Sequence, residues 1–524
     1  MNNKNLLNLI ILIFVSLGCL SKTVEAKDYE DVQAEVSFIE YIPDQGNLVL
    51  GVYSDGTLAL ETNRLSSSEL DSLSTVIDSV SFKGKKLDTQ LITTPVKTAY
   101  RQVLLIGLGE KEAKLSSLDW QLIGDKATQQ SIKHFKSAAP VLLDLSPEHV
   151  ANVAFGAKLA GYYFDKYYSS DDQKRRQDKI TLVSKNSNAS RQFYLDELNH
   201  LAKAIWYARD ISNEPANVIY PESFVARWKA HLSGMDNVRI KVLDEKDMLK
   251  MNMGAIYGVG RGSKRPPRIM IVEYDGGKKG EAPVVIVGKG ITFDTGGISI
   301  KKSDKMWNMK FDMSGAASAI GTVYALAGRK AKVNVIGIAA LAENMPGGNA
   351  QRPGDVVPTM SGKTVQIRST DAEGRLVLAD AVYYADVTYK PKELIDLATL
   401  TGSAARALGK DYAALFSRHD DMVAVLEDAG RISGEEVWHL PLNKKHFKAI
   451  KNNVADVMNS GPSAPGASAG AAFIGTFINE QTRWAHLDIA GVAYQDDAIP
   501  FKASPGSRSF GIRLLNQYLK AVHE

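Results

Sequence analysis

Cysteine is almost absent from this chain of 524 residues, in which Cys19 is the only one. Once the N-terminal segment that carries Cys19 is removed, the chain can form no disulfide, no thiolate metal site and no cysteine nucleophile. The zinc-binding motif HExxH is missing, and residues 288–290 (Gly-Lys-Gly) lack the spacing of a nucleotide-binding P-loop. The chain also has little net charge for its length. The formal net charge is +4, so composition gives no reason to expect nucleic acid or an anionic membrane as a partner.

The N-terminal apolar run, Leu6–Leu20, is short for a membrane span. It follows Lys4 and is followed by polar residues that end at Ala26, a pattern typical of a secretory signal peptide. We therefore expect residues 1–26 to be a signal peptide that is cleaved after Ala26, and the protein to be exported to the periplasm or secreted. Two alternatives remain open: an uncleaved signal that acts as a membrane anchor, and a lipoprotein anchored through Cys19.

Beyond this segment, strand-like and helix-like stretches alternate, which is typical of an α/β fold with a largely parallel sheet. The length of the chain favours two domains. A polar, turn-rich stretch at 184–191 predicts a boundary between them. We expect a smaller N-terminal α/β domain over 27–190, a connecting amphipathic helix over 191–215, and a larger C-terminal α/β domain with a mostly parallel central sheet over 216–524.

Seven charged residues gather in two short segments of the larger domain, among small and apolar neighbours. They are Lys289, Asp294, Lys301, Asp312, Asp371, Glu373 and Arg375. Asp294 follows a predicted buried strand at 284–287, and ligands of open α/β sheets usually lie beyond the carboxyl ends of the strands. Four carboxylates in a pocket of low dielectric repel one another unless a cation holds them. Such oxygen-rich sets suit one or two divalent metal ions, which we expect at this place.

Asp371 and Glu373 are two residues apart, so on an extended segment both side chains would point towards one ion. The alternative is a turn or helix start, in which Thr370 or Asp371 caps the helix that follows. Arg375, two residues further on, can hold a small anion through two parallel hydrogen bonds.

Lys289 and Lys301 allow two interpretations. They can be loop lysines that point into solvent, as we expect of Lys302 and Lys305. In a dry site with cations nearby, however, the pKa of a lysine falls and its neutral amine can bind a metal ion. A second lysine that stays charged can polarise a carbonyl group in the transition state.

These segments resemble the leucyl aminopeptidases, a family of hexameric enzymes with two metal ions per subunit. The resemblance rests on GKGITFDTGGISIK at 288–301, DMSGAA at 312–317 and DAEGRLVLADA at 371–381. TLTG at 399–402 and AHLDIAG at 485–491 extend it. The larger domain is then a metallopeptidase domain, whereas the N-terminal domain resembles the family in position and α/β character alone.

The resemblance implies a role for each residue of the charged set. Asp294 and Glu373 would bridge two divalent metal ions, Mn²⁺ or Zn²⁺. Lys289 and Asp312 would complete one metal site, and Asp371 the other through its side chain and its carbonyl oxygen. Catalysis would rest on Lys301, which stabilises the oxyanion, and on Arg375, which holds a bicarbonate that acts as general base towards a water between the metals.

The resemblance also implies the substrate and the assembly. The enzyme would release N-terminal residues from peptides, with Leu and Met preferred because the pocket for the first side chain is apolar, and it would form a homo-hexamer. The residues implied in substrate binding are Met309, Thr399, Leu400, Gly402, Ala490 and Ala493. Two features depart from the family pattern: Ser369 stands where Asn is usual, and the loop 460–468 is longer and richer in Pro and Ser.

Two other functions remain open at this point. One is a dipeptidase of the Cys-Gly type, and the other is a non-catalytic binding or assembly protein on the same fold. The complete charged set argues against the second.

Overall fold

The computed structural model describes residues 33–61, 63–93, 100–461 and 466–524. The predicted signal peptide, with Cys19 and Ala26, lies outside the described residues, and so does part of the loop 460–468. No helix in the described part of the chain is both long enough and apolar enough to span a membrane.

The N-terminal part contains a six-stranded sheet, in which all neighbouring strands are parallel except β3 and β4. Its strands are β1 (Glu35–Ile39), β2 (Gly46–Tyr53), β3 (Thr89–Thr93), β4 (Tyr100–Gly109), β5 (Val141–Leu142) and β6 (Lys179–Val183), in the order β1-β6-β5-β2-β4-β3. The helices of this part are α2 (Ser67–Ser79), α3 (Ser117–Phe135), α4 (Pro147–Ala160) and the 3₁₀ turn η1 (Asp171–Gln173). Helices α3 and α4 approach each other closely at a glycine. A Cβ atom at Gly124 would lie 1.9 Å from the carbonyl oxygen of Val153, so no other residue fits there.

The segment that follows is helical, as predicted for 191–215, but the helical run begins earlier, at Ser187, and contains a π-helical turn. It consists of α5 (Ser187–Phe193), a π-helical turn η2 (Tyr194–Leu198) and α6 (Asn199–Asn213). Helix α5 therefore begins within the polar, turn-rich stretch at 184–191. Turn-forming residues favoured a loop, but Ser187 and Ser190 are buried, and this tertiary packing outweighs their local preference.

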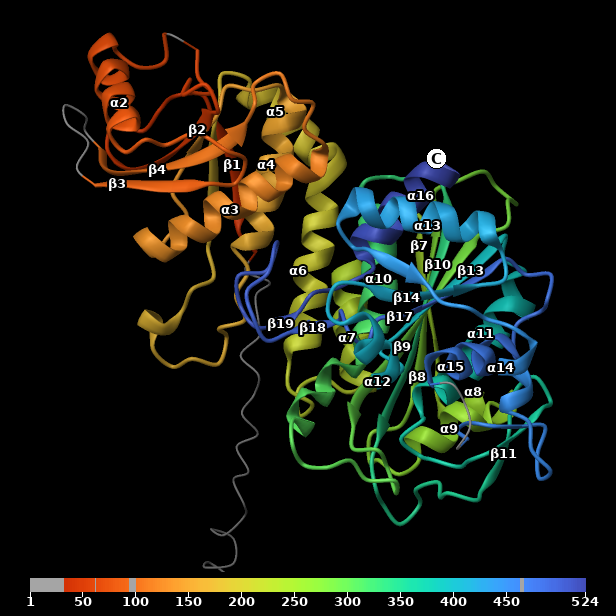
Figure 1. Ribbon diagram of the computed structural model, residues 1–524. Helices are drawn as coiled ribbons and strands as arrows, with labels where there is room; N and C mark the ends of the chain where they lie inside the picture. The colour runs from red at the N-terminus through yellow and green to blue at the C-terminus, as the bar shows by residue number, and fades with distance from the viewer. Residues whose placement is uncertain (1–32, 62, 94–99, 462–465) are drawn as a thin grey trace, which may run out of the picture. The chain divides into compact units, whose positions relative to one another are not determined.

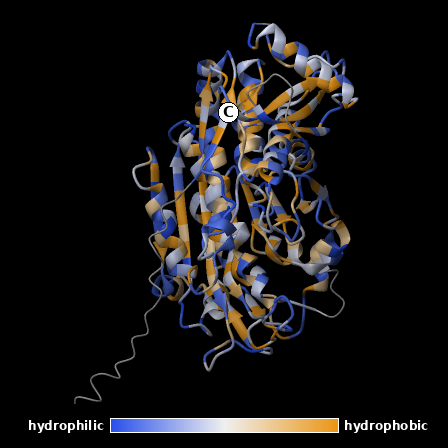
Figure 2. Ribbon diagram, turned by 90° about the vertical axis from the view of Figure 1, so that its left-hand side faces the viewer, coloured by the Kyte–Doolittle hydropathy of each residue, from blue (hydrophilic) through white to orange (hydrophobic). Residues whose placement is uncertain are grey.

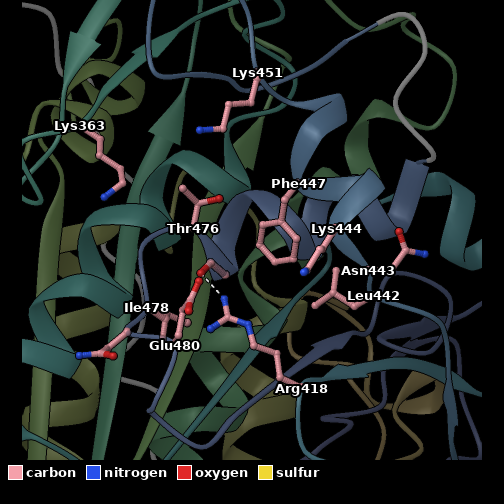
Figure 3. Close-up of a pocket in the computed structure, with 12 residues that line it drawn as sticks. Lys363, Arg418, Leu442, Asn443, Lys444, Phe447, Lys451, Thr476, Ile478 and Glu480 are labelled. Carbon is pink, nitrogen blue, oxygen red and sulfur yellow. Dashed lines mark hydrogen bonds between the residues drawn. The ribbon is translucent and has the colours of Figure 1, made fainter.

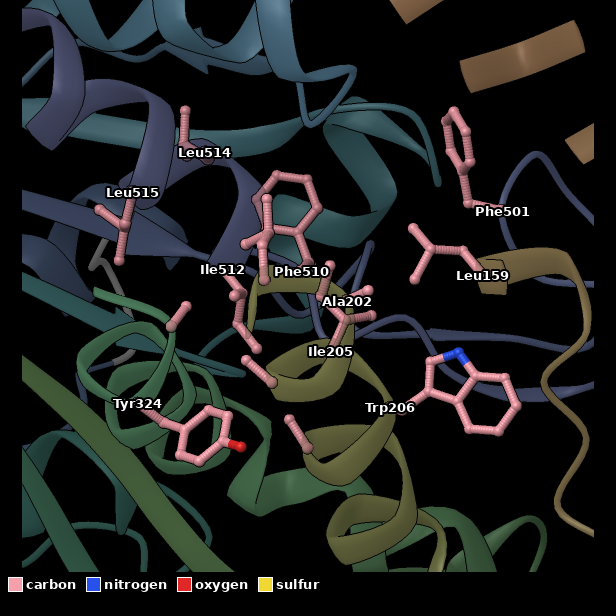
Figure 4. Packing of buried hydrophobic residues seen from close by; sticks show 14 of the residues in the cluster. Leu159, Ala202, Ile205, Trp206, Tyr324, Phe501, Phe510, Ile512, Leu514 and Leu515 are labelled. Atoms are coloured by element: carbon pink, nitrogen blue, oxygen red, sulfur yellow. The ribbon is translucent and has the colours of Figure 1, made fainter. Parts of the chain in front are cut away.

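Helix α6 is buried along much of its length. Ala202, Ile205 and Trp206 pack in a cluster with Phe510 and Tyr324 (Figure 4). Removing these side chains from water is the main source of its stability, because helices of this length are marginal in isolation.

The C-terminal part contains an eight-stranded mixed sheet whose four central strands are parallel (Figure 1). Its order is β15-β14-β17-β13-β9-β10-β8-β7. The strands are β7 (Val238–Leu243), β8 (Arg268–Asp275), β9 (Val284–Asp294), β10 (Asn334–Asn344), β13 (Glu393–Ala398), β14 (Ala413–Ser417), β15 (Val437–His439) and β17 (Trp484–Asp488). This architecture confirms the predicted fold class, an α/β protein with a smaller N-terminal sheet and a larger, mostly parallel one.

Helices cover both faces of the larger sheet, which separates two hydrophobic clusters. One cluster includes α6, α7 (Pro221–Leu232), α10 (Ser314–Gly328), α13 (Asp420–Ser433) and α16 (Ile512–His523). The other includes α8 (Glu245–Lys250), α9 (Gly254–Gly260), α11 (Gly374–Tyr389), α12 (Gly402–Leu408), α14 (Lys444–Ala449) and α15 (Gly466–Gly475). The helices carry both polar and apolar residues along their length, as expected of elements with one face in a core (Figure 2).

Small elements complete the fold. They are the 3₁₀ segment η3 (Met306–Met313), a three-stranded sheet of β11 (Val356–Pro358), β12 (Thr364–Gln366) and β16 (Val457–Met458), and a pair formed by β18 (Tyr494–Gln495) and β19 (Gly506–Ser507).

Glycines let helix α10 approach strands β9 and β13 closely. A Cβ atom at Gly288 would lie 2.3 Å from the carbonyl oxygen of Gly315, and one at Gly315 would lie 2.2 Å from that of Leu397. No side chain fits at either position. The close packing brings the start of α10, preceded by η3, next to the carboxyl ends of β9 and β13.

Candidate metal centre

The charged residues predicted from sequence meet at the carboxyl ends of neighbouring parallel strands. Lys289 and Asp294 lie on β9, and Asp312 lies near the end of η3. Asp371 and Glu373 lie in the turn that leads into α11. Asp294, Asp371 and Glu373 each offer one carboxylate oxygen to the cluster. These three oxygens lie within 4.8 Å of one another. Three separate stretches of sequence therefore supply one acidic cluster.

Lys289 lies inside this cluster and is almost fully buried. Its Nζ lies 2.8 Å from Oε1 of Glu373, 2.9 Å from Oδ2 of Asp312 and 2.8 Å from the carbonyl oxygen of Thr399. Burial opposes the charged form of Lys289, but the surrounding carboxylates outweigh burial and raise its pKa. Without metal ions the lysine is thus held as an ammonium group by its acidic neighbours.

Lys301 approaches the cluster from the more open side. Its Nζ lies 2.8 Å from Oδ2 of Asp294 and also pairs with Asp371. The side chain of Lys301 is 24% exposed and that of Asp371 is 38% exposed, so this edge of the cluster is accessible to a ligand. Lys302 and Lys305 are exposed, as predicted.

The cluster carries surplus negative charge. Its four carboxylates and two lysines leave two negative charges when all are ionised. Burial, followed by mutual repulsion, raises the pKa of Asp294, and burial raises that of Asp312 well above its usual range. Oδ2 of Asp312 and Oε2 of Glu373 are buried without a hydrogen-bond partner in the described residues, although Lys289 lies 2.9 Å from the former. A divalent cation would satisfy both the orphaned oxygens and the charge, so the residues fit a metal centre.

A buried asparagine that the sequence analysis missed orients Asp294. Nδ2 of Asn344 donates to Oδ1 of Asp294 at 2.7 Å and to the carbonyl oxygen of Thr370 at 3.0 Å. The backbone N–H of Gly296 donates to the same Asp294 oxygen at 2.8 Å. Asn344 ends β10, the strand beside β9, so its position at the same sheet edge is a signal that could have revealed it.

The segment around Asp371 is a turn that leads into α11, so the second of the two interpretations, a turn or helix start, holds there. The cap that this interpretation assigned to Thr370 or Asp371 is not formed, because no side chain caps this helix. Instead Oγ1 of Thr370 donates to the carbonyl oxygen of Gly296 and accepts from the N–H of Ser299. Glu373 is the residue before α11, and the helix start turns its carboxylate towards Lys289.

Ser369, a departure from the family pattern, keeps a hydrogen bond in this turn. Its Oγ accepts from the backbone N–H of Asp371 at 3.2 Å. The serine hydroxyl therefore makes a local hydrogen bond of the kind that the usual Asn side chain is expected to make.

Arg375 offers a free edge for a small anion. Its Nη1 donates to the carbonyl oxygen of Asn459 at 2.8 Å. Nε is buried without a partner, and neither Nε nor Nη2 makes a hydrogen bond to any residue that the structure describes. Burial lowers the pKa of Arg375. The Nε–Nη2 edge is the geometry with which arginine binds planar oxyanions through two bonds.

Asn459 is the second residue that the sequence analysis missed, and it holds the whole turn. Fully buried, it accepts the N–H of Arg368 at 2.8 Å through Oδ1, and its Nδ2 donates to the carbonyl oxygens of Ser369 and Ala372 at 2.6 and 3.2 Å. Because Asn459 is remote in sequence and lies in a Ser- and Gly-rich stretch, no local pattern marks it.

Asn459→Ala is expected to lower the free energy of unfolding by about 1–3 kcal/mol, because it leaves several buried backbone groups unpaired. It should also weaken metal affinity by roughly 10–100-fold, as loss of supporting contacts does at metal sites. Thermal unfolding and metal titration check this. The control is Asn452→Ala, because this partly buried asparagine bonds to Gln366, Val454 and Ala455 and not to the turn at the metal centre. A variant with wild-type metal affinity would show that Asn459 does not position the turn.

The residues predicted to bind substrate lie on three segments. Met309 is on η3, Thr399, Leu400 and Gly402 follow β13, and Ala490 and Ala493 follow β17. Oγ1 of Thr399 donates to Oδ1 of Asp312 at 2.6 Å, which links the second segment to the acidic cluster.

Asp488 joins two of these segments. Its carboxylate accepts the N–H groups of Leu400 at 3.1 Å, Thr401 at 3.3 Å and Ala490 at 3.2 Å. Ala493 is only 2% exposed, so it can contribute no more than the floor of a pocket.

A large cavity elsewhere does not belong to this centre. It has a volume of about 780 Å³ and is lined by Lys363, Arg418, Lys444, Phe447 and Lys451, among others (Figure 3). None of the seven charged residues lines it, and it is open and poor in acids. It is therefore a surface feature separate from the metal centre.

A GxSxG nucleophile elbow was not expected from the sequence, but residues 466–470, Gly-Ala-Ser-Ala-Gly, do match the spacing of that motif of serine hydrolases. Ser468 lies inside α15, and its Oγ donates to the carbonyl oxygen of Pro441 at 3.1 Å. No histidine of the described chain is hydrogen-bonded to it. The match is therefore a coincidence of composition.

Comparisons with known proteins agree with this geometry. Residues 206–516 match the model of the cytosol aminopeptidase family, catalytic domain, and residues 49–171 match that of its N-terminal domain. A probable cytosol aminopeptidase of Chelativorans sp. (strain BNC1) is 41% identical over 92% of this chain and 97% of its own length. One of Wolbachia pipientis wMel is 40% identical over 94% and 97%.

Two solved structures are similar over nearly the whole chain. The bottromycin maturation enzyme BotP in complex with Mn is 28% identical, with a TM-score of 0.77 over 92% of this chain and 100% of its own. A mutant of tomato leucine aminopeptidase is 27% identical, with a TM-score of 0.78 over 94% and 97%.

Proposed function

Because this chain belongs to the cytosol aminopeptidase family, whose members are metal-dependent peptidases, we propose that it removes apolar N-terminal residues, Leu and Met above all, from peptides by means of two divalent ions. The observation that carries the proposal is the largely buried cluster, accessible at the edge of Asp371, in which Asp294, Asp371 and Glu373 converge. The Mn complex of the similar enzyme BotP supports Mn²⁺ as one candidate metal, and Zn²⁺ is the other.

Five residues would hold the two ions. They are Lys289, Asp294, Asp312, Asp371 and Glu373, whose side chains meet in the acidic cluster. Lys289 must lose a proton to bind a metal ion, since its acidic neighbours keep it charged in their absence. When bound, the ions acidify a water, polarise the scissile carbonyl and bind the free amine of the substrate.

Lys301 and Arg375 would act directly on the reaction. The Lys301 ammonium, at the accessible edge of the cluster, would donate a hydrogen bond to the carbonyl oxygen as negative charge develops on it. The free edge of Arg375 would hold a bicarbonate, which takes the proton of the attacking water as general base.

The pocket for the first side chain would be formed by the segments of Met309, Thr399–Gly402 and Ala490–Ala493. Their side chains are mainly small or apolar, which favours Leu and Met. The discrimination between similar apolar side chains is modest, because each methylene contributes about 1–3 kcal/mol.

A panel of substrates tests this proposal. Leucine p-nitroanilide should be cleaved, its N-acetyl derivative should be cleaved roughly 10³-fold more slowly because the amine is blocked, and aspartate p-nitroanilide should be a poor substrate. Tripeptides and longer peptides should be cleaved as well as dipeptides. Cleavage of dipeptides alone would favour the Cys-Gly type of dipeptidase, and equal cleavage of the acetylated substrate would contradict an aminopeptidase.

Two further proposals concern the whole protein. We propose that it is exported after cleavage behind Ala26, supported by the composition of residues 1–26, and N-terminal sequencing of the mature protein tests this. We also propose that it forms a homo-hexamer, supported by its family. Sedimentation analysis tests this, and a monomer that is fully active would contradict it.

A further inference from the structure

A small, partly open cavity lies apart from the metal centre, between α6, the start of α16 and the segment 499–508. Its volume is about 20 Å³. Ile205 and Phe501, which belong to the packed cluster in Figure 4, form part of its wall. Four cationic side chains contribute to the remainder: Arg209, Lys502, Arg508 and Arg513. This is an unusual lining for a cavity inside a hydrophobic core.

None of these four cations forms an ion pair with a described carboxylate, and three of them are buried. Arg209 is 3% exposed, Lys502 1% and Arg513 7%. Their hydrogen bonds go to neutral acceptors. Arg209 donates to the carbonyl oxygens of Leu159 and Phe501 at 3.2 and 2.7 Å, and Arg513 donates to the side-chain oxygen of Gln121 at 2.8 Å.

Lys502 and Arg508 are bonded in the same way. Nζ of Lys502 donates to the carbonyl oxygens of Gln495 at 3.3 Å and of Ser504, and Nη1 of Arg508 donates to that of Lys410 at 2.9 Å. Neutral carbonyl groups orient a cation but do not compensate its charge.

The nearest carboxylates do not balance the positive charge of the four cations. Glu435 lines the cavity and offsets part of the charge of Arg513 and Arg508, while its Oε2 accepts the N–H groups of Gly511 and Leu514, both at 2.9 Å. Asp125 accepts the N–H of Phe501 at 2.9 Å, and burial raises its pKa to about 7. Four cations thus face one acid on the cavity wall.

The pKa values show the same imbalance. Burial and the neighbouring arginines lower the pKa of Lys502 to about 7, and burial lowers that of Arg209 to about 10. Nε of Arg209 is buried and has no hydrogen-bond partner among the described residues. A buried donor on a buried cation, beside a cavity, is costly unless something accepts its hydrogen bond.

We propose that this cavity binds one small monovalent anion of the halide class, with chloride as the natural ligand. The volume accommodates a single particle of about the size of a water molecule, so a monatomic anion fits it better than phosphate or a carboxylate. An anion supplies the negative charge that the four cations lack. A water would accept the Nε–H bond but would leave the charge uncompensated.

The anion would fasten the segment 495–508 to α6 and α16. Tyr494, just before this segment, packs on Phe311 with ring centroids 4.4 Å apart, and Phe311 adjoins Asp312 of the metal centre. The anion is therefore a structural ligand that supports the wall of the active site without touching the reacting atoms.

Anomalous diffraction from crystals of the full protein grown in sodium bromide tests the proposal without any variant. Bromide should replace chloride and give an anomalous peak in the cavity between Arg209, Lys502 and Arg513. A cavity that holds a water and shows no anomalous signal would overturn the proposal.

Thermal unfolding provides the second test. At equal ionic strength, chloride or bromide should raise the melting temperature in a saturable way, by about 2–3 °C at 100 times the dissociation constant, relative to gluconate, which is too large to enter. Arg508→Gln removes one partly exposed cation of the cavity and should weaken halide affinity at least 10-fold. Arg431→Gln, on the exposed side of α13, should leave it unchanged. Equal melting temperatures in chloride and gluconate, or equal halide dependence of both variants, would refute a halide site.

Discussion

Replacing Glu373 by Gln is expected to lower kcat/KM for leucine p-nitroanilide by roughly 10³-fold or more, while the protein stays folded. Glu373 is 2% exposed, its Oε1 accepts from Lys289 at 2.8 Å, and its Oε2 has no hydrogen-bond partner in the described chain. Gln has nearly the same volume and can still accept from Lys289 through its amide oxygen. It lacks the charge of the carboxylate that would bridge two cations, so metal binding suffers and packing does not.

Circular dichroism and thermal unfolding of metal-free Glu373→Gln check that the fold persists. Its melting temperature should lie within a few degrees of the metal-free wild type, because the loss of an ion pair is offset by the loss of repulsion among buried acids. Glu222→Gln, on the exposed first turn of α7, is the matched control and should keep full activity. Wild-type turnover by Glu373→Gln would remove Glu373 from the metal centre.

Removal of the metal ions is the second change with a large expected effect. Exhaustive chelation should reduce activity by at least roughly 10³-fold, because nothing else in the described cluster can acidify a water or polarise the carbonyl to the same degree. The metal-free cluster retains two surplus negative charges and two orphaned oxygens, so divalent ions should bind again readily.

Much of the candidate site could be predicted from sequence, because its residues carry charges in places where charge is costly. Asp294, Asp312 and Glu373 stand out among glycines and apolar residues, and a buried acid demands a partner. The parallel strands that carry them were recognisable from their continuous apolar runs, of which β9 is an example. The α/β class and the sheet edge that holds the site follow from these two signals.

What could not be predicted depends on contacts between distant segments. Asn459 lies about 90 residues from the turn that it holds, and Asp488 links the segments after β13 and β17. An asparagine or aspartate has no distinctive sequence pattern in this role. The start of α5 was missed for a related reason, since the burial of Ser187 and Ser190 is decided by the tertiary packing and not by local preference.

The central claim is that the cluster of Asp294, Asp312, Asp371 and Glu373 holds the divalent ions with which this protein cleaves peptides. Its most direct test is the hydrolysis of leucine p-nitroanilide by the chain from Lys27 onwards, measured after chelation and again during titration with Mn²⁺ or Zn²⁺. We predict that activity disappears and returns as two ions per subunit are bound, and that Glu373→Gln does not recover. Full turnover by a protein shown to be free of metal would contradict the account.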